Sequence, residues 1–264
     1  MRDQRIIGIL FLFFWIASCS TKKDAFLNWN FHAMTTKYNV LYNGKVAYQQ
    51  GIDEINAQYE DDFWELLPIE PIKFKGNVIK APKFNNSLGG PGAPKGKENE
   101  QEATSPFDRA EEKAVKAIQK HSMRFYEKEK NRQIDDAYLL LGKSRYYTER
   151  FVPAIEAFNY IITNYPEANL IYETKIWRAK ANIRIDNPEL AIETMNILLR
   201  QPDLTEELRE ETHTTLAMAH MKMDSIHLVK DQLWLAIKTS KNKVQRARNL
   251  FILGQLYAME KNKD

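Results

Sequence analysis

Three evenly spaced histidines are the residues whose pattern most directly suggests metal chemistry. His213, His220 and His227 follow one another at intervals of seven residues. On one helix, a spacing of seven separates two side chains by about 10.5 Å along the axis, whereas chelation from a single helix needs a spacing of four. His227 also lies beyond a predicted turn at Asp224-Ser225. We therefore expect surface or packing histidines and no metal site.

Other catalytic patterns are missing from the sequence. The glycine-rich stretch at residues 89–92 is neither preceded by a predicted strand nor followed by Gly-Lys-Ser/Thr, so it does not predict a phosphate-binding loop. We find no nucleophile elbow, no cysteine-based metal motif and no dinucleotide-binding or kinase pattern. The sequence therefore predicts a protein that is not an enzyme and needs no cofactor.

The single cysteine of the chain, Cys19, has a different chemistry. It has no second cysteine with which to form an intramolecular disulfide. A basic start with Arg2 and Arg5 leads into an apolar stretch at residues 6–16. This stretch fits the ~7–15 residues of a signal-peptide core and is shorter than the ~20 residues of a membrane-spanning helix. Residues 16–19, Ile-Ala-Ser-Cys, resemble the bacterial lipobox.

That resemblance implies a lipid-anchored protein. Residues 1–18 would be a signal peptide, and the mature chain would begin at Cys19 with acyl chains attached to it. Two or more acyl chains hold a protein stably on a membrane. Removing Arg2, Arg5 and Asp3 with the signal peptide lowers the formal net charge from +3 to +2. Such a near-neutral balance gives no reason to expect nucleic acid as a partner.

Composition divides the chain after the signal peptide into three regions. Residues 19–84 form a predicted lipidated N-terminal helical region, rich in aromatics to residue 65 and then interrupted by prolines. Residues 85–106 contain no aromatic or β-branched aliphatic side chain, so we predict a disordered linker. Residues 107–264 have helical periodicity throughout. The predicted fold class is therefore all-α.

From about residue 134 the helical pattern repeats. Gly142 is followed by Ala154, Phe158 and Pro166, which fit positions 8, 20, 24 and 32 of the ~34-residue tetratricopeptide repeat. Arg145 departs from this pattern, because position 11 usually holds tyrosine. The same frame continues with Ala179, Ala191 and Met195 in a second unit, with Ala217, Val229 and Leu233 in a third, and with Gly254 in an incomplete fourth. Residues 186–188 (Asp-Asn-Pro) and 224–225 (Asp-Ser) fit the turns inside the second and third units. The sequence thus predicts a tetratricopeptide-repeat helical solenoid.

The end of the chain does not look like a solenoid cap. A terminal helix usually has a polar outer face, whereas the fourth unit contains Leu250, Phe251, Leu253 and Leu256. We therefore expect either that the sequence is part of a longer chain or that another structure covers this end.

The first helices of such repeats line a concave groove. Aromatic, methionine and cationic side chains there suit a partner helix or peptide, although some of them are equally expected to pack within the solenoid. The predicted groove residues are Leu139, Lys143, Tyr146, Tyr147, Ile176, Lys180, Arg184, Met218, Met221, Lys222, Phe251 and Gln255.

Three N-terminal stretches go beyond a generic repeat protein. They are residues 37–44 (KYNVLYNG), 51–55 (GIDEI) and 61–70 (DDFWELLPIE). With the start at residues 19–24 (CSTKKD), they resemble the tetratricopeptide-repeat lipoprotein of the gliding-motility and type IX secretion machinery of Bacteroidota. The resemblance implies a non-enzymatic scaffold that links the ring and motor complex to the outer-membrane translocon. Members of that family are much longer than this chain.

The residues after Cys19 bear on which side of the membrane the protein occupies. Lipoproteins of Bacteroidota that reach the cell surface tend to carry an acidic cluster at this place, whereas residues 20–24 are Ser-Thr-Lys-Lys-Asp. We therefore expect the periplasmic face of the outer membrane.

Two other lipoprotein classes stay open as alternatives. Residues 154–158 and 164–166 also resemble repeat lipoproteins of the outer-membrane barrel-assembly complex, which lack the predicted linker and the 61–70 stretch. Glycan-capturing lipoproteins of nutrient-uptake systems embed similar repeats but face outward. An enzyme would need a catalytic domain beyond residue 264.

Overall fold

A computed structural model of the chain describes residues 20–72 and 105–261. The predicted signal peptide, Cys19 and most of the predicted linker lie outside the described residues. The described part is mostly helical with almost no strand, which confirms the all-α prediction. Within those two ranges, no helix is both long and apolar enough to cross a bilayer. The elements are α2 (Phe26–Thr35), η1 (Thr36–Leu41), α3 (Tyr42–Gln58), α4 (Pro106–His121), β1 (Arg124–Phe125), β2 (Lys128–Glu129), α5 (Ile134–Tyr147), α6 (Phe151–Asn164), α7 (Ile171–Arg184), α8 (Pro188–Leu198), α9 (Glu206–Lys222), α10 (Ile226–Thr239) and α11 (Lys243–Lys261).

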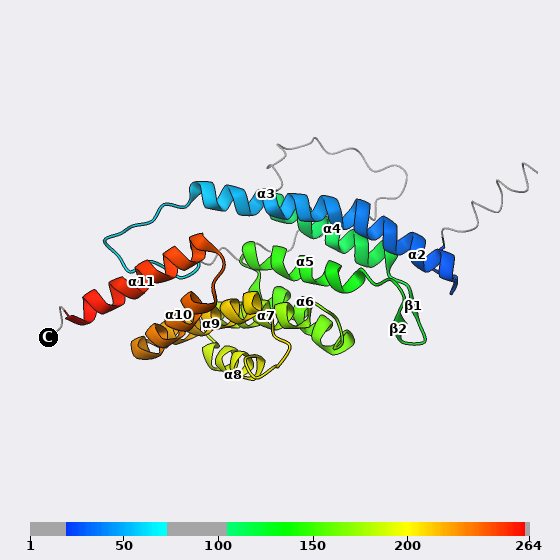
Figure 1. Ribbon diagram of the computed structural model, residues 1–264. Coiled ribbons are helices and arrows are strands. Elements are labelled where there is room, and N and C mark those ends of the chain that lie inside the picture. The colour runs from blue at the N-terminus through cyan, green and yellow to red at the C-terminus, as the bar shows by residue number, and fades with distance from the viewer. Residues whose placement is uncertain (1–19, 73–104, 262–264) are drawn as a thin grey trace, which may run out of the picture.

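Helices α2 and α3 join through the π-helical turn η1 into one long rod, which we call the N-terminal rod (Figure 1). The rod packs on α4 through small residues. A Cβ atom at Gly51 would lie 2.6 Å from the ring of Phe107, and one at Gly44 would lie 2.8 Å from Leu140. Ala110, Ala114 and Ala117 of α4 are fully buried. The rod and the helices from α5 onward therefore share one continuous packing through α4.

The start of α4 corrects one predicted boundary. Ser105 and Pro106 fall at the end of the predicted linker, yet Ser105 is the N-cap of α4 and Pro106 is its first residue. The Ser105 hydroxyl accepts a hydrogen bond from the Asp108 backbone N–H at 3.1 Å. Serine at the N-cap followed by proline is a strong helix start, so the helix begins before the linker was expected to end.

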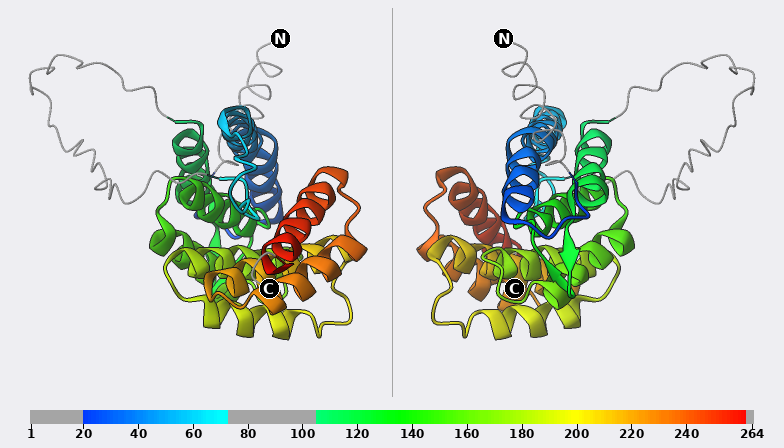
Figure 2. Two further views of the ribbon diagram at one scale, coloured as in Figure 1. Left: turned by 90° about the vertical axis from the view of Figure 1, so that its left-hand side faces the viewer. Right: turned by 90° about the vertical axis from the view of Figure 1, so that its right-hand side faces the viewer.

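From α5 onward the helices form successive hairpins, α5 with α6, α7 with α8 and α9 with α10, followed by α11 alone (Figures 1 and 2). The predicted crossing residues are buried in all three hairpins. Glu149, Asp186 and Asp224 each lie seven residues after the predicted position 8, and all three have positive φ, of 62°, 59° and 55°. The same backbone turn thus recurs in the same frame, and the turns predicted at residues 186–188 and 224–225 are confirmed.

A short β-hairpin between α4 and α5 was not expected from the sequence. Arg124 pairs with Glu129 and Phe125 with Lys128. Tyr126 and Glu127 at its tip have φ of 50° and 63°, as a tight two-residue turn requires. A strand of two residues is too short to show any periodicity, which explains why the sequence pattern missed it.

Glycines at equivalent places in two units provide a matched stability test. A Cβ atom at Gly142 would collide with the ring of Phe158, whereas nothing lies within 4 Å of one at Gly254. We expect Gly142→Ala to lower the free energy of unfolding by about 2 kcal/mol through overpacking. Gly254→Ala should raise it by about 0.5 kcal/mol, because a helix-interior glycine is replaced without a clash. Urea unfolding measures both, and equal effects of the two changes would contradict the predicted contact.

Candidate functional site

The concave face of the helix hairpins is occupied by the chain itself. Residues 59–72, which we call the docked segment, leave the end of α3 and turn back past α11 (Figure 1). The segment contacts α5, α7 and α11 through hydrogen bonds and ion pairs, and its apolar side chains join a core that includes residues of α9. A non-helical part of the N-terminal region thus lies where a groove for a partner was predicted.

Two residues of α11 hold the first half of the docked segment. The guanidinium of Arg248 binds both carboxylate oxygens of Asp61, at 2.9 and 3.1 Å, and also donates to the Pro68 carbonyl at 3.0 Å. The side-chain amide of Gln255 donates to the Glu65 carbonyl at 2.8 Å and accepts from the Leu67 N–H at 3.1 Å. A side-chain amide that pairs with both backbone groups recognises extended chain directly.

Leu67 and Ile69 anchor the segment in the apolar core. Each is only 3% exposed, and both belong to the same buried cluster as Ile176 and Met218. Pro68 between them is exposed. Alternate residues of extended backbone point to opposite sides, so this short stretch buries two side chains and turns the third outward.

Glu70 ends the segment in a buried ionic cluster. Its carboxylate accepts hydrogen bonds from the Tyr146 hydroxyl at 2.5 Å and from Arg184 at 2.6 Å. Lys180 lies 3.9 Å from it and also binds Glu211 at 2.8 Å. Burial by itself lowers the pKa of Lys180 and Arg184, but the neighbouring Glu70, with Glu211 for Lys180 and the Tyr146 hydroxyl for Arg184, raises both above their usual values. Both cations therefore stay charged beside the Glu70 carboxylate.

Eight of the predicted groove residues surround the docked segment. Four bind it directly through polar groups, three pack in or against its apolar cluster, and Phe251 meets the ring of Phe63 edge to face at 5.3 Å. The eight are Tyr146, Ile176, Lys180, Arg184, Met218, Met221, Phe251 and Gln255. The expectation of an open groove is corrected here, because the buried members of this set hold the chain's own segment.

The other four predicted groove residues have contacts elsewhere. Leu139 packs among α5, α6 and α7, and Tyr147 stacks on Phe107 with ring centroids 4.9 Å apart. Lys143 pairs with Glu173 at 2.6 Å, and Lys222 pairs with Asp186 at 2.7 Å. Leu139 and Tyr147 thus pack within the helical layers, which the sequence had left open as an alternative.

The docked segment also presents an exposed aromatic pair. Trp64 is 98% exposed and Phe63 is 62% exposed. The Asp62 carboxylate accepts a hydrogen bond from the Trp64 backbone N–H at 3.0 Å, which closes a local turn. We call Phe63, Trp64 and the half-exposed Phe251 the aromatic rim. Large exposed aromatics on an ordered segment are typical of protein-binding surfaces.

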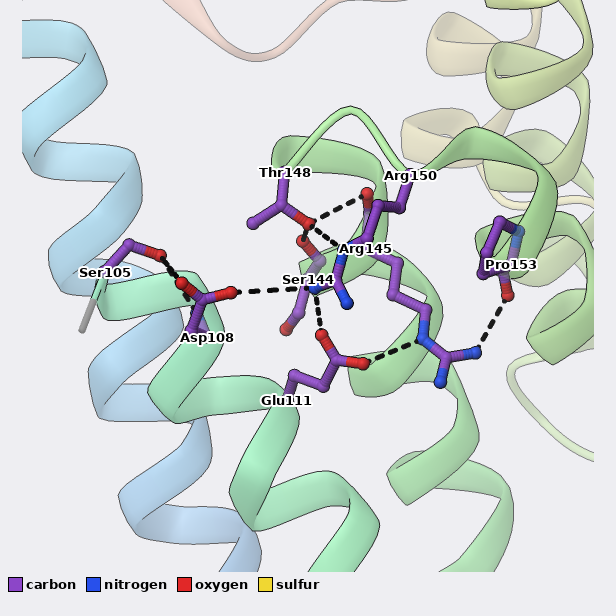
Figure 3. Close-up of polar contacts among 8 residues, drawn as sticks. All are labelled: Ser105, Asp108, Glu111, Ser144, Arg145, Thr148, Arg150 and Pro153. Atoms are coloured by element: carbon purple, nitrogen blue, oxygen red, sulfur yellow. Dashed lines mark hydrogen bonds and ion pairs between the residues drawn. The ribbon is translucent and has the colours of Figure 1, made fainter. Parts of the chain in front are cut away.

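A second polar cluster fastens α4 to the first hairpin (Figure 3). The Glu111 carboxylate binds Arg145 at 2.9 Å and also Arg150, and Arg145 donates to the Pro153 carbonyl at 3.1 Å. Asp108 lies 3.6 Å from Arg150. Arg145, which departs from the repeat pattern at position 11, is therefore explained by a carboxylate on the preceding helix. Both carboxylates drawn in Figure 3, of Asp108 and Glu111, are paired with a guanidinium. These ion pairs hold α4 against the first hairpin.

The histidines do not gather around an ion. Within residues 20–72 and 105–261, no group of three or more His, Cys, Asp or Glu side chains could hold a metal. His213 instead makes a hydrogen bond with Gln232 of α10 at 2.8 Å. A pair that the sequence did not reveal, His32 of α2 and His121 of α4, meets through the Nδ1 atoms at 3.0 Å.

Removing the Glu70 charge should destabilise the protein. Glu70→Gln leaves Arg184 without its carboxylate, and we expect the free energy of unfolding to fall by about 2 kcal/mol, because hydrogen bonds to charged groups each contribute roughly 1.5–3 kcal/mol. Glu65→Gln is the matched control, since the Glu65 side chain is exposed and only its backbone carbonyl is used. Urea unfolding with limited proteolysis of residues 59–72 measures the effect. Equal stability of the two variants would rule out the Glu70 cluster as an anchor.

Acid should weaken the fold through its buried histidines. Burial lowers the pKa of His121, with His32 adding to the effect, and burial also lowers the pKa of His213 and His220. A histidine with a lowered pKa in the folded state contributes stability above its unfolded pKa of about 6.5 and loses that contribution as the pH falls. The free energy of unfolding should therefore decrease from about pH 7 to about pH 5.

His121→Gln should make the decrease of the free energy of unfolding with falling pH shallower. His227→Gln, at an exposed position, should leave most of that decrease unchanged. Urea unfolding at several pH values tests this pair, and identical slopes for wild type and His121→Gln would contradict it.

Helix hairpins, a docked segment and an aromatic rim are the features from which a function can be inferred. No family model matches the chain, and no curated protein matches its sequence.

Proposed function

We propose that this chain is a non-enzymatic scaffold lipoprotein at the periplasmic face of the outer membrane. Cys19 carries the lipid, the hairpins from α5 onward are tetratricopeptide-type repeats, and the partners are ring and translocon components of a type IX secretion and gliding-motility assembly. The anchor rests on the lipobox-like residues 16–19 and the lone cysteine. The assembly rests on the resemblance of residues 37–44, 51–55 and 61–70.

The equivalence of the hairpins supports the repeat assignment. A Cβ atom at Gly142 would collide with Phe158, as expected where a small residue at position 8 meets a large one at position 24 of the repeat. Phe158, Met195 and Leu233 take that large position in successive hairpins and are all fully buried. A residue with positive φ also precedes the second helix of each hairpin, namely Glu149, Asp186 and Asp224. Neither burial nor apolar periodicity requires this backbone conformation, so it is a separate point of similarity between the hairpins.

The observation that carries the scaffold proposal is the docked segment with its aromatic rim. Residues 61–70 hold the strongest family-like stretch, and the structure gives its members distinct physical tasks. Asp61, Leu67, Ile69 and Glu70 bind the hairpins, while Trp64 is left almost fully exposed. A segment fixed at both ends that presents aromatics to solvent suits the capture of a protein partner, because aromatic anchors contribute much of the binding energy at interfaces.

The partner surface is therefore assigned to the aromatic rim rather than to the buried groove. Tyr146, Lys180 and Arg184 hold Glu70, so replacing them would release the chain's own segment and report on stability. Trp64 and Phe63 are exposed, so their loss should leave the fold intact.

Co-purification from detergent-solubilised membranes tests this proposal. We expect the wild type to bring down ring or translocon components, and Phe63→Ala with Trp64→Ala to reduce their recovery about tenfold or more, since an aromatic hot spot contributes roughly 2 kcal/mol or more. Tyr126→Ala, which removes a 94% exposed aromatic at the β-hairpin tip, is the matched control and should retain the partners. Urea unfolding should be unchanged in both variants.

Two further outcomes decide the broader claim. Cys19→Ala should abolish lipid labelling and membrane fractionation, and deletion of the gene should abolish type IX secretion together with surface gliding in a gliding species. A wild-type chain that brings down no component of the assembly would refute the scaffold role, even if Cys19 is lipidated.

A further inference from the structure

The first part of the N-terminal rod buries polar residues and exposes large apolar ones. Its buried face begins with Asn28, His32 and Thr36 and becomes apolar from Val40 onward, whereas its outer face carries large apolar side chains among polar ones such as Asn30. Seven large apolar side chains on that face are between 44% and 71% exposed. We call them the rod stripe; they are Phe26, Leu27, Phe31, Met34, Tyr38, Tyr42 and Val46.

The polar residues are inside because each has a partner there. The Asn28 side chain donates to the Ser20 carbonyl at 2.7 Å, and His32 meets His121 of α4. Thr36 donates to the His32 carbonyl at 2.7 Å and accepts from Asn131 at 3.0 Å. Buried polar groups are tolerated when they are hydrogen-bonded in this way. The apolar side chains are left to the opposite face.

The rod stripe runs without a break from Phe26 to Val46, in the first part of the rod. From Leu27 onward its members follow one another at spacings of three or four residues, which places them on one side of a helix. The π-helical turn η1 adds a residue to one turn, and the later spacings of four keep Tyr42 and Val46 on the same side. From Phe26 to Val46 the stripe is about 30 Å long at 1.5 Å per residue. Exposed apolar surface of this extent marks an interaction site.

The charges around the rod stripe favour an anionic surface. No Asp or Glu occurs between Asp24 and Asp53, although the chain contains 35 acidic residues. Lys37 lies in the same stretch, and Lys22 and Lys23 directly precede it. Lys45, the other lysine of the stretch, pairs with Asp136 of α5 at 3.1 Å. Lysines beside an apolar helical face with aromatics are the pattern of helices that lie in a lipid headgroup layer.

The position of the rod in the chain favours lipid over a protein partner. Phe26 follows Cys19 by seven residues, which span at most about 25 Å even when fully extended. A lipid on Cys19 therefore keeps the rod close to the bilayer.

We propose that the rod stripe lies in the membrane interface and binds lipid directly, as a second attachment besides the acyl chains. This inference deepens the anchored state of the proposed function, but the binding itself does not require the lipid on Cys19. A protein with both attachments has a fixed face toward the membrane, whereas a lipid tether alone leaves the rod free to rotate.

Vesicle binding by the non-lipidated protein tests the inference apart from the proposed function. The mature chain with Cys19→Ala is mixed with vesicles of phosphatidylethanolamine and phosphatidylglycerol and sedimented. We expect it to bind, and to bind more weakly to phosphatidylcholine vesicles because the lysines lose their anionic partners. Leu27→Gln, Phe31→Gln and Met34→Gln together should lower the partition coefficient about tenfold or more, since three large apolar side chains leave the interface.

The matched control removes three exposed apolar side chains from the second helices of the repeats. Val152→Gln, Leu190→Gln and Ile197→Gln should change the partition coefficient by no more than about twofold. Because Cys19→Ala leaves the chain without cysteine, Met34→Cys can carry a single polarity-sensitive fluorophore. Its emission should shift to the blue on vesicles, whereas the same label at Val152→Cys should not respond.

Three results would overturn the inference. The first is that the Cys19→Ala chain and its triple-glutamine variant sediment with vesicles to the same extent. The second is that the Cys19→Ala chain does not bind vesicles at all. The third is that the Cys19→Ala chain self-associates without binding vesicles and that the triple-glutamine variant no longer self-associates. That result would make the rod stripe an interface between copies of the chain. Failure of secretion or co-purification would leave all these measurements unaffected, so the two proposals fail separately.

Discussion

The carboxylate of Glu70 is the contact on which the arrangement of the inner face depends. Tyr146 and Arg184 both bind it, with Lys180 close by, so three groups from two helices converge on one side chain. Buried cations are costly unless they are paired. Lys180 has Glu211 as a second partner, but the carboxylate bound to Arg184 comes from the docked segment. The inner face of the repeats is thus completed by residues that precede them in the chain.

The contacts of the docked segment also determine which of its side chains are exposed to solvent. The docked segment is fixed by the Arg248–Asp61 pair at one end and by Leu67, Ile69 and Glu70 at the other. Phe63 and Trp64 lie between these contacts, where the Asp62 carboxylate closes a local turn by accepting from the Trp64 N–H. An exposed tryptophan on a segment held at both ends loses little conformational entropy when it binds a partner. Burial of one part of the segment therefore prepares the other part for binding.

Local periodicity accounts for what the sequence predicted well. The crossing positions Ala154 and Phe158, and the turn at Asp186, follow from residue size and backbone conformation within a single hairpin. The docking of residues 59–72 was not predictable in this way, because Asp61 and Arg248 are 187 residues apart and extended chain with prolines has no helical period. Arg145 was a usable signal, since a cation in place of tyrosine implied a carboxylate nearby. The groove prediction identified the correct helix face but not its occupant.

The N-terminal rod shows why an apolar pattern alone can assign the wrong face to the core. Periodicity would bury Leu27, Phe31 and Met34, yet His32 bonds His121 of α4 and Thr36 accepts from Asn131, so the opposite face is buried. Figures 1 and 2 show the rod and α8 on opposite sides of the molecule. A rod that lies on a membrane would therefore turn the helix hairpins away from it. Hydrogen bonds at the buried face of one helix would in this way set the orientation in which the scaffold meets its partners.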